Sequence, residues 1–423
     1  MLFLIRMKRV CILGLGYIGL PKACLLSKSY NVLGVDTNKE LVSNINNNQI
    51  HTTEPGLKEL LTEALESKRF TAKTQVEKAD VFVIAVPTPL NAENAAELKY
   101  VKSAAEMITP LLRKGNLVIL ESTVPPKTSR HFVIPILEKS GLMAGKDFYF
   151  AYCSERAFPG DTLNEMINNS KIIGGINKKS AEMARELYSS FIKGEIFITK
   201  DVVAESVKLM ENIYRDVNIA LANELAKIAK DLGINILEAI ELANKHPRVK
   251  ILRPGPGVGG HCIPIDPRFL ITKDSKLLKT AREINDTMPG HIISLLKEII
   301  KTNNVHVSTV GILGAAYKAN VNDARETPTL KLIELAKKQG WNVKVTDPYV
   351  KKFIHPLVTL GETLNSDIII IATDHDEYKN LSIDMLKNLQ SKIIFDTRNC
   401  IKPNTKTKLE QAGFKIFTLG NHK

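Results

Sequence analysis

The sequence of 423 residues lacks a long apolar run. No stretch approaches the roughly 20 apolar residues that a membrane-spanning helix needs, so we expect no such helix. The start, MLFLIRMKRV, is apolar only briefly, because Arg6, Lys8 and Arg9 interrupt it and no small-residue cleavage site follows. We therefore expect no signal peptide, and Met7 is an alternative translation start.

Cysteine is scarce and has no paired spacing. The five cysteines are an odd number, and none of them belongs to a CxxC pair. This pattern argues against a disulfide framework and against a zinc ribbon, and it favours a reducing, cytoplasmic setting. We expect no metal site.

The charge is strongly positive but has no concentrated block. The formal net charge is +13, yet no run of five like charges occurs. Dispersed positive charge fits an anionic small-molecule ligand at least as well as nucleic acid. We expect neither nucleic acid nor a membrane as a partner.

Continuous apolar runs alternate with amphipathic stretches such as 58–67 in the first part of the chain. The runs predict buried parallel strands at 9–16, 31–36, 81–89 and 117–123, with a strand at 195–199 closing the unit. Strands that alternate with helical patterns are typical of βαβ units, so we predict an α/β fold.

A single helical period then runs from residue 201 to a glycine at 233. It is longer than a crossover helix and predicts a spine between domains. Beyond further helix, a second alternating unit predicts strands at 308–314, 341–348, 367–375, 392–399 and 415–420. We predict domains at 1–200 (Rossmann), 201–303 (all-helical, with the spine helix) and 304–423 (Rossmann-like α/β).

The motif GLGYIG follows the first predicted strand and opens a helix. Gly14 permits the tight turn, Gly16 lets the backbone approach a pyrophosphate, and Gly19 permits close helix–strand packing. Asp36 ends the next strand, where a carboxylate meets a ribose 2′-hydroxyl and repels a 2′-phosphate. The arrangement predicts NAD binding, whereas an ordinary glycine turn or a non-binding Rossmann unit is the alternative.

Two further strand ends carry hydroxyl groups. PTP (87–89) and STVPP (122–126) place Thr88 and Thr123 at the carboxyl ends of strands, where ligands of such sheets bind. Simple threonine turns are an equal alternative.

Three polar residues of the long helix share one face. Lys208, Asn212 and Arg215 are spaced i, i+4 and i+7. A lysine and an amide directed at one point can stabilise a developing oxyanion, although a solvated polar stripe is the commoner arrangement.

The segment PGPGVGGHCIPIDP (254–267) surrounds Cys262 with glycine and proline. A backbone that open can wrap a phosphate or a sugar, and a thiolate near positive charge, for which His261 and Lys208 are candidates, is a strong nucleophile. A buried inert cysteine is the alternative. Asp266 and Glu155 read first as surface carboxylates, and each is also a candidate to position water or the lysine.

Taken together, these motifs resemble the UDP-glucose/GDP-mannose dehydrogenase family of UDP-sugar 6-dehydrogenases over nearly the whole chain. The resemblance rests on GLGYIGLP, PTP, ILESTVPP, YCSER, ENIYRDVNIALANELA, HPRV, PGPGVGGHCIPIDP and NDARETP, in that order. RDVNIALANELA and HPRV are most similar to the branch that oxidises UDP-N-acetyl-D-mannosamine. The IPIDP run also occurs in the UDP-N-acetylglucosamine branch, so the C2 epimer stays open.

The resemblance implies two successive NAD-dependent oxidations at the sugar C6, for surface glycan synthesis, in a homodimer or higher homo-oligomer. It implies a catalytic set of Cys262 as nucleophile, Lys208 and Asn212 at the oxyanion, Asp266 supporting Lys208, and Glu155 with Thr123 positioning the hydrolytic water. NAD would contact Tyr17, Ile18, Asp36, Thr88, Thr123 and Arg325, besides the three glycines. The UDP-sugar would contact Arg156, Ala157, Lys208, Asn212, Arg215, His246, Arg248, Gly259, Tyr317 and Lys318, with the HPRV segment coming from a partner subunit.

Three other functions remain alternatives. The first is a UDP-N-acetylglucosamine or UDP-glucose 6-dehydrogenase. The second is a two-electron β-hydroxyacid dehydrogenase, which needs neither Cys262 nor a C-terminal nucleotide-binding unit. The third is a non-enzymatic NAD-sensing or scaffold protein, in which Cys262 and Lys208 would be replaceable.

Overall fold

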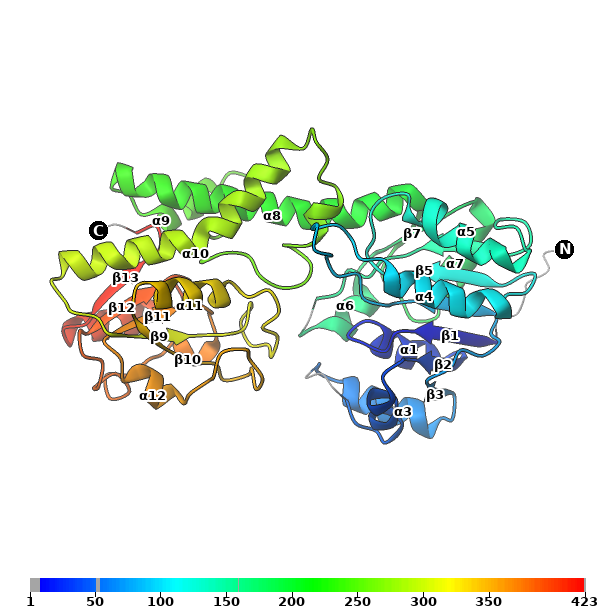
Figure 1. Ribbon diagram of the computed structural model, residues 1–423, viewed down its shortest axis with the longest axis horizontal. Coiled ribbons are helices and arrows are strands. Elements are labelled where there is room, and N and C mark those ends of the chain that lie inside the picture. The colour runs from blue at the N-terminus through cyan, green and yellow to red at the C-terminus, as the bar shows by residue number, and fades with distance from the viewer. Residues whose placement is uncertain (1–7, 51–53, 159, 422–423) are drawn as a thin grey trace. The chain divides into compact units, whose positions relative to one another are not determined.

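The computed structural model describes residues 8–50, 54–158 and 160–421. The predicted absence of a signal peptide and the alternative start at Met7 therefore lie outside the described residues. The chain divides into two compact units (Figure 1). Residues up to Glu211, with Arg268–Leu270, form the first, and Asn212–Pro267 with Ile271–Lys423 form the second.

The first unit alternates strands and helices. Its elements are β1 (Arg9–Leu13), α1 (Gly19–Ser27), β2 (Asn31–Val35), α2 (Lys39–Asn46), α3 (Leu57–Glu66), β3 (Phe70–Lys73), β4 (Val81–Ile84), α4 (Lys99–Ile108), β5 (Leu117–Leu120), α5 (Ile134–Leu137), β6 (Tyr149–Tyr152), α6 (Thr162–Asn168), β7 (Lys171–Gly175), α7 (Lys178–Tyr188) and β8 (Ile196–Lys200). Short helical turns cover Thr109–Leu111, Ser129–Val133 and Glu138–Ser140.

Within the described residues, eight strands of this unit form one sheet in the order β3-β2-β1-β4-β5-β6-β7-β8. The strands from β3 to β6 are parallel, β7 runs antiparallel to β6, and β8 runs parallel to β7. The strand order reverses between β1 and β4. In an open α/β sheet this is the point at which the carboxyl ends of the strands leave a crevice for a ligand.

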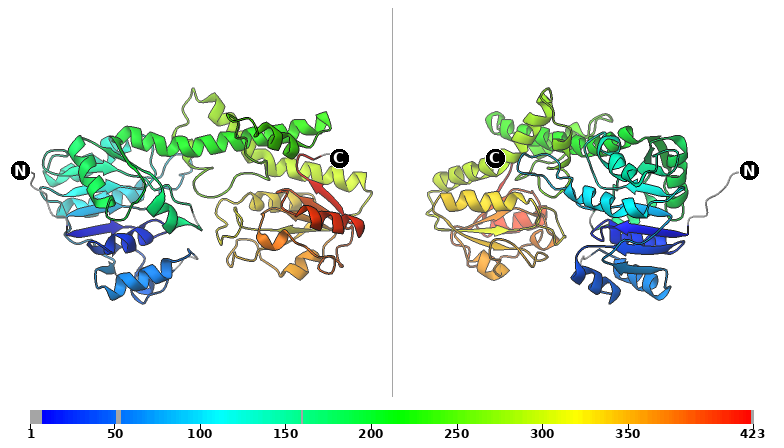
Figure 2. Two further views of the ribbon diagram at one scale, coloured as in Figure 1. Left: turned by 180° about the vertical axis from the view of Figure 1, so that it is seen from behind. Right: turned by 45° about the vertical axis from the view of Figure 1, so that its right-hand side comes forward.

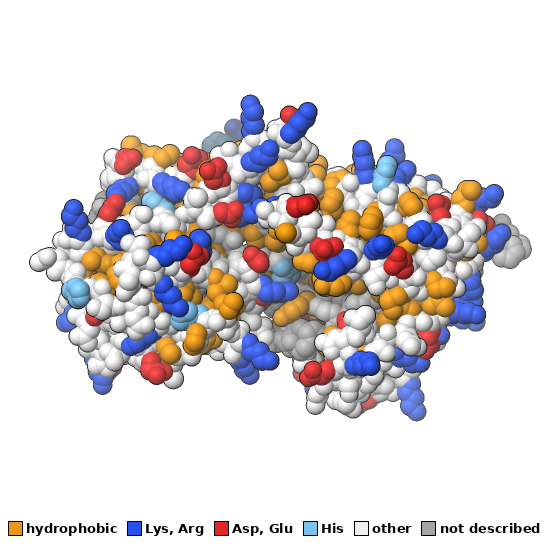
Figure 3. All heavy atoms as spheres, viewed as in Figure 1, with side chains coloured by type: hydrophobic (Ala, Val, Ile, Leu, Met, Phe, Trp, Pro, Cys, Tyr) orange, Lys and Arg blue, Asp and Glu red, His pale blue; other side chains and the backbone are white. Residues whose placement is uncertain are grey.

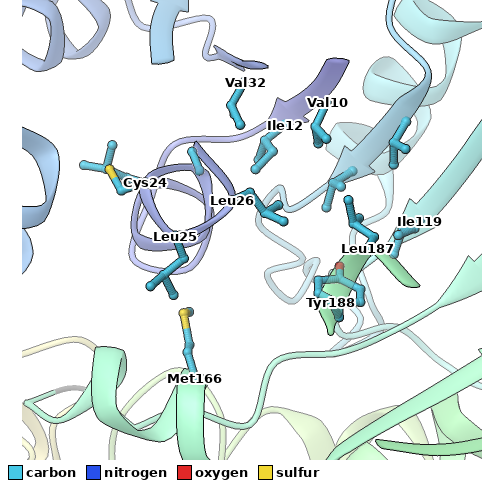
Figure 4. Close-up of a cluster of buried hydrophobic side chains, with 14 of the residues drawn as sticks. Val10, Ile12, Cys24, Leu25, Leu26, Val32, Ile119, Met166, Leu187 and Tyr188 are labelled. Carbon is cyan, nitrogen blue, oxygen red and sulfur yellow. The ribbon is translucent and has the colours of Figure 1, made fainter. Parts of the chain in front are cut away.

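Alternating side chains of β1 fill two cores, one on each face of the sheet. Val10 and Ile12 pack with α1, α3 and α7, whereas Cys11 and Leu13 pack with α4 and α5. Figure 4 shows part of the first core, to which α1, β1, β2, β5 and α7 contribute the labelled side chains Leu26, Ile12, Val32, Ile119 and Leu187. Because both faces are covered, the strands are continuous apolar runs, as the sequence predicts.

The second unit contains a helical segment followed by another parallel sheet. Its elements after the long helix α8 (Asp201–Leu232) are α9 (Ile236–Ala243), α10 (Lys276–Thr302), β9 (Thr309–Leu313), α11 (Pro328–Lys338), β10 (Asn342–Thr346), α12 (Leu360–Leu364), β11 (Ile368–Ile371), a turn (Asp376–Tyr378), β12 (Ile393–Asp396), α13 (Pro403–Gln411) and β13 (Lys415–Thr418). A short turn at Asp266–Phe269 contains the division between the units after Pro267. In the described residues, five strands form a parallel sheet in the order β10-β9-β11-β12-β13, with β13 at one edge (Figure 2).

The predicted fold class is confirmed: two α/β sheets are joined by a helical region. The predicted helix at 201–233 is α8, which ends at Leu232, and the boundary between the compact units falls inside it. The division into three domains therefore stays a prediction. In the described part of the chain, no helix combines the length and the apolar character that crossing a membrane requires.

The surface charge can be followed on one face of the molecule. On the face drawn in Figure 3, Lys and Arg side chains are scattered among Asp and Glu side chains.

Candidate active site

The glycine turn after β1 has the geometry of a dinucleotide cradle. Gly14 has φ +94°, and a Cβ there would lie 2.5 Å from the Ala85 carbonyl oxygen. A Cβ on Gly19 would lie 1.8 Å from the Gly14 carbonyl oxygen, whereas a Cβ on Gly16 would meet nothing within 4 Å. Gly14 and Gly19 are thus required by the fold itself, while Gly16 leaves open space for a ligand to approach the backbone.

The residues after Gly16 begin α1 without a capping side chain. Tyr17 and Ile18 are half-buried, and Ile18 occupies the N-cap position with no side-chain hydrogen bond to the helix. The Leu20 N–H already donates to the Gly16 carbonyl oxygen at 3.2 Å and Pro21 has no N–H, so the attraction for a phosphate here comes from the helix dipole and the open backbone at Gly16. This turn fits the pyrophosphate of NAD.

Asp36 closes the cradle from the end of β2. Its Oδ2 accepts the Leu15 N–H at 3.0 Å, and its Oδ1 accepts the Asn38 N–H at 2.9 Å. The carboxylate thus ties the glycine turn to the second strand. It remains partly exposed at the position where the sequence predicts the ribose 2′-hydroxyl.

Thr88 and Thr123 are brought together at the next two strand ends. The Thr88 hydroxyl donates to the Thr123 carbonyl oxygen at 2.7 Å, and both residues are half-buried. The loops after β4 and β5 are further joined by Ser122, whose hydroxyl donates to the Val86 carbonyl oxygen at 2.6 Å. The structure therefore places both predicted threonines at the crevice edge of the sheet.

The side chain of Glu155 is buried and accepts four hydrogen bonds, so it is not a surface carboxylate. Its Oε2 accepts hydrogen bonds from Lys22 at 2.9 Å and from Lys171 at 2.8 Å. Its Oε1 accepts the backbone N–H groups of Arg156 at 2.7 Å and Ala157 at 3.1 Å. Burial alone would raise the pKa of Glu155, but the charges of Lys171 and Lys22 outweigh burial and hold its pKa well below the ordinary value.

The same cluster extends to a second carboxylate. Lys22 also forms a fully buried ion pair with Glu121, which accepts the hydroxyl hydrogen of Tyr188. Sequence reasoning missed Lys22, Lys171 and Tyr188. The available signal was the lysine inside GLPKACLL of α1, where every residue is buried. A buried lysine requires partners, because an isolated buried charge is costly.

Arg156 and Ala157 directly follow Glu155 in the chain. The Arg156 guanidinium forms an ion pair with Glu211 at 2.6 Å and donates to the Ser170 carbonyl oxygen at 2.8 Å. Glu155 therefore fixes the backbone of the loop, and Glu211 fixes the arginine. Both predicted UDP-sugar residues are half-buried.

Lys208, Asn212 and Arg215 all lie on α8, as the sequence predicts, and Asn212 is hydrogen-bonded to the segment that contains Cys262. Asn212 is buried, its amide nitrogen donates to Asp266 and its oxygen accepts from Arg215. Asp266 is itself only 3% exposed, so it is not a surface carboxylate. It belongs to the same compact unit as Asn212, whereas Lys208 belongs to the other, so the predicted support of Lys208 by Asp266 stays a prediction.

The glycine-rich segment packs tightly against the start of the second α/β sheet. A Cβ on Gly259 would lie 2.7 Å from Cβ of Tyr317, and one on Gly260 would lie 2.7 Å from the Tyr317 ring. The Gly260 N–H donates to the Arg325 carbonyl oxygen at 3.0 Å. The backbone is thus glycine because the neighbouring chain approaches so closely, and Cys262 follows this contact as a half-buried thiol.

Cys262 differs from the other cysteines in its surroundings. Its Sγ lies 3.2 Å from Nδ1 of His261. By contrast, burial raises the pKa of Cys11, Cys24 and Cys153 to about 12, which makes these thiols inert near neutral pH. Cys400, which is half-buried as Cys262 is, also has a pKa raised by burial, so the contact with His261 is the feature that favours a reactive role for Cys262. No group of three His, Cys, Asp or Glu side chains suited to a metal occurs among the described residues.

The remaining predicted residues lie in the second unit. Arg325 is exposed and forms a bidentate contact with Asp323, at 2.6 Å between Nη2 and Oδ2. His246 and Arg248 are exposed just beyond α9, and Tyr317 and Lys318 are half-buried after β9. Contacts of these residues with NAD or a sugar stay predictions.

Comparison with known proteins gives one answer along the chain. Residues 8–192, 202–287 and 311–403 match the NAD binding domain, the central domain and the UDP binding domain of the UDP-glucose/GDP-mannose dehydrogenase family. UDP-N-acetyl-D-mannosamine dehydrogenase of Methanocaldococcus jannaschii is 48% identical, over 98% of this chain and 97% of that protein.

Solved structures agree with this result. The UDP-D-ManNAc dehydrogenase from Pyrococcus horikoshii is similar, with a TM-score of 0.91 and 41% identity, over 98% of this chain and 99% of that chain. The UDP-N-acetyl-mannosamine dehydrogenase Cap5O from Staphylococcus aureus has a TM-score of 0.89 and 41% identity, with the same coverage.

Proposed function

Because the chain belongs to the UDP-glucose/GDP-mannose dehydrogenase family and is an NAD-binding UDP-sugar dehydrogenase, we propose that it oxidises UDP-N-acetyl-D-mannosamine at C6 to UDP-N-acetyl-D-mannosaminuronate. The observation that carries the choice of sugar is the 48% identity, over nearly the full length, to an enzyme of that name. The observation that supports a four-electron route is the half-buried Cys262 beside His261 in a glycine-lined segment.

The proposed reaction has two oxidations and one hydrolysis. NAD, held at the glycine turn, would accept a hydride from C6 in each oxidation. The Cys262 thiol adds to the aldehyde formed by the first oxidation, which gives a thiohemiacetal, and the second oxidation converts this adduct to a thioester. Water then cleaves the thioester and restores the thiol. The aldehyde stays bound throughout, so it is not released to react elsewhere.

Lys208 and Asn212 are proposed to stabilise the oxygen on C6. The side-chain amide of Asn212 is held by Asp266, so its orientation is set before the substrate arrives. Lys208, one helical turn earlier on α8, would supply the positive charge or the proton, and Asp266 is proposed to support it as well.

Glu155 and Thr123 are proposed to position the hydrolytic water. Four donors already fill the Glu155 carboxylate, and its depressed pKa keeps it ionised at neutral pH. It is therefore a poor acceptor of a proton from water. We propose that Glu155 acts through position, by holding the loop that carries Arg156, rather than as a general base.

A homodimer is proposed to form along α8. Exposed apolar side chains recur on this helix at intervals of seven and four residues, at Val203, Met210, Tyr214, Leu221, Ile228 and Leu232. Such a seam buries itself best against another helix, and a second copy of α8 offers the same surface. The exposure of His246 and Arg248 supports the proposal that they complete the partner's UDP-sugar site.

The cysteines bear on the cellular compartment in which we propose that the reaction takes place. No disulfide links the five cysteines, all of which lie in the described part of the chain, and this supports a reducing cytoplasm. Oxidation of a nucleotide sugar to its uronic acid supports a role in supplying surface glycan synthesis.

Initial rates of NADH formation with UDP-N-acetylmannosamine, UDP-N-acetylglucosamine and UDP-glucose test the choice of substrate. We expect kcat/KM to be highest for the mannosamine sugar by at least about tenfold, the ratio that corresponds to 1.4 kcal/mol of transition-state binding. A higher kcat/KM for either other sugar would reassign the substrate without changing the chemistry.

A further inference from the structure

We propose that His261 is the base that takes the thiol proton of Cys262, and that the charge of Asp323 stabilises the resulting imidazolium. This inference rests on the proposed role of Cys262 as the nucleophile. It assigns the activation of that thiol to residues within one compact unit of the chain.

The two ring nitrogens of His261 face two different groups. Nδ1 lies 3.2 Å from the Cys262 Sγ, and Nε2 lies 3.9 Å from Oδ2 of Asp323. A neutral imidazole with its proton on Nε2 can accept the thiol proton at Nδ1, and the positive charge then faces the carboxylate. At 3.9 Å the carboxylate is too far from Nε2 for a hydrogen bond, so in the order thiol, imidazole, carboxylate it acts on the imidazolium through its charge.

The backbone holds this arrangement in place. Gly260 has φ +87°, and its N–H is bonded to the Arg325 carbonyl oxygen at 3.0 Å. The ring of Tyr317 leaves no room for a side chain at Gly260. Because this contact immediately precedes His261, the histidine is carried to the segment that contains Asp323 without a long flexible connection.

The charges around His261 favour its protonated form when the thiol ionises. Asp323 is 5% exposed at its side chain, and Arg325 binds both of its oxygens. Burial raises the pKa of Asp323, but the hydrogen bonds from Arg325 and the charges of Arg325 and His261 lower it by more. The net effect is a lowered pKa, so the carboxylate stays ionised. Asp266, on the turn after Cys262, accepts a hydrogen bond from Asn212, and the Tyr317 ring lies against Gly260.

The proton and electron balance needs no further reactant. The S–H bond breaks as its proton moves to Nδ1, and the sulfur electron pair forms the S–C6 bond. The π pair of the aldehyde moves to its oxygen, and this oxygen takes the proton back from the His261 imidazolium, which completes the thiohemiacetal and restores the neutral imidazole. His261 therefore serves the addition step, and the hydride transfer from the alcohol that precedes it does not require this base.

The pH dependence of iodoacetamide alkylation at Cys262, measured by peptide mass spectrometry in the intact wild-type chain, tests the proposal directly. A thiolate–imidazolium pair makes the alkylation rate reach its midpoint below the pH of about 8.5 that an ordinary thiol shows. His261→Gln should move the midpoint upward by about 1.5 pH units. At pH 6.5 the higher thiol pKa leaves less thiolate, so alkylation slows. The slowing is only roughly fivefold, because the thiolate of a less acidic thiol is intrinsically more nucleophilic and offsets part of the loss.

Control variants separate the effect of the His261–Cys262 pair, here called the dyad, from other causes of a shifted alkylation midpoint. His306→Gln, an exposed histidine of the same unit, should leave the curve unchanged. Asp323→Asn should shift the midpoint in the same direction as His261→Gln but by less. Lys208→Met should shift it less than His261→Gln, since the proposal places the activating charge on the imidazole. Each variant's unfolding temperature verifies that it folds.

The possible results decide between the claims. A wild-type midpoint at or above 8.5, or superimposable curves for wild type and His261→Gln, overturns the dyad. So does a larger shift from Lys208→Met than from His261→Gln. If Cys262→Ser still forms the uronic acid, the nucleophile is wrong, yet the alkylation curves report on the dyad independently. Loss of acid formation in Cys262→Ser, together with unshifted curves, rejects this inference alone.

Discussion

Replacing Glu155 by Gln should destabilise the first unit strongly. The substitution removes the negative charge that compensates Lys171 and that, together with Glu121, compensates Lys22; the two lysine side chains are 5% and 0% exposed. Removing one partner of a buried ion pair costs about 3–5 kcal/mol. For a unit of about 200 residues, each kcal/mol lowers the unfolding temperature by roughly 2–4 °C. We therefore expect a fall of about 6–20 °C at pH 7, measured by circular dichroism or calorimetry.

The pH dependence of this effect has a defined sign. Because the folded-state pKa of Glu155 is lowered, its contribution to stability is present above the unfolded-state pKa and is lost as the pH falls through the folded-state value. The gap between wild type and Glu155→Gln should stay constant from about pH 5 to pH 8 and narrow below about pH 4.3. Glu182→Gln, which breaks an exposed i,i+4 pair with Lys178, is the matched control and should change the unfolding temperature by about 1–2 °C at most. A fall no larger than that control's would refute the buried network.

Three other substitutions probe the cofactor site and the assembly. Asp36→Asn should lower kcat/KM for NAD about tenfold, the effect of losing about 1.4 kcal/mol, and weaken discrimination against NADP; an unchanged NAD/NADP ratio would contradict the ribose assignment. Gly16→Ala should fold normally but lose most NAD affinity in calorimetry, whereas Gly19→Ala should lower the unfolding temperature by several degrees, since overpacking costs about 1–3 kcal/mol. Leu221→Lys combined with Ile228→Lys places charges on the α8 seam and should halve the mass seen in sedimentation velocity, and an unchanged mass would argue against this interface.

The elements with the strongest local pattern could be predicted from the sequence. The predicted helix at 201–233 and α8 end within one residue of each other, because an uninterrupted helical period ends at a glycine. The strand β7 was not among the predicted strands, and it ends in two glycines, Gly174 and Gly175. A side chain has no room at either glycine: a Cβ on Gly174 would lie 2.6 Å from Cα of Asp201, and one on Gly175 would lie 2.6 Å from the Ala181 nitrogen. The need for glycine there comes from helices packed on the strand, which a local pattern does not contain.

Some residues of the candidate site could also be predicted from the sequence, and others could not. Gly14, Gly16 and Asp36 could be found because their spacing follows from a strand–turn–helix unit. Lys22 could not, because its role depends on Glu121 and Glu155, which lie 99 and 133 residues further along the chain. Asp266 and Glu155 read as surface carboxylates in the sequence, and only the fold reveals that each is buried among donors.

The count of NADH formed per sugar tests the central claim most directly. Purified protein is given limiting UDP-N-acetylmannosamine and excess NAD, and the wild type is compared with Cys262→Ser. The four-electron route through the thiol predicts two NADH and one uronic acid per sugar in the wild type, and no uronic acid in the variant. One NADH per sugar in the wild type, or uronic acid from Cys262→Ser, would contradict that route and favour a two-electron dehydrogenase or a thiol-independent oxidation.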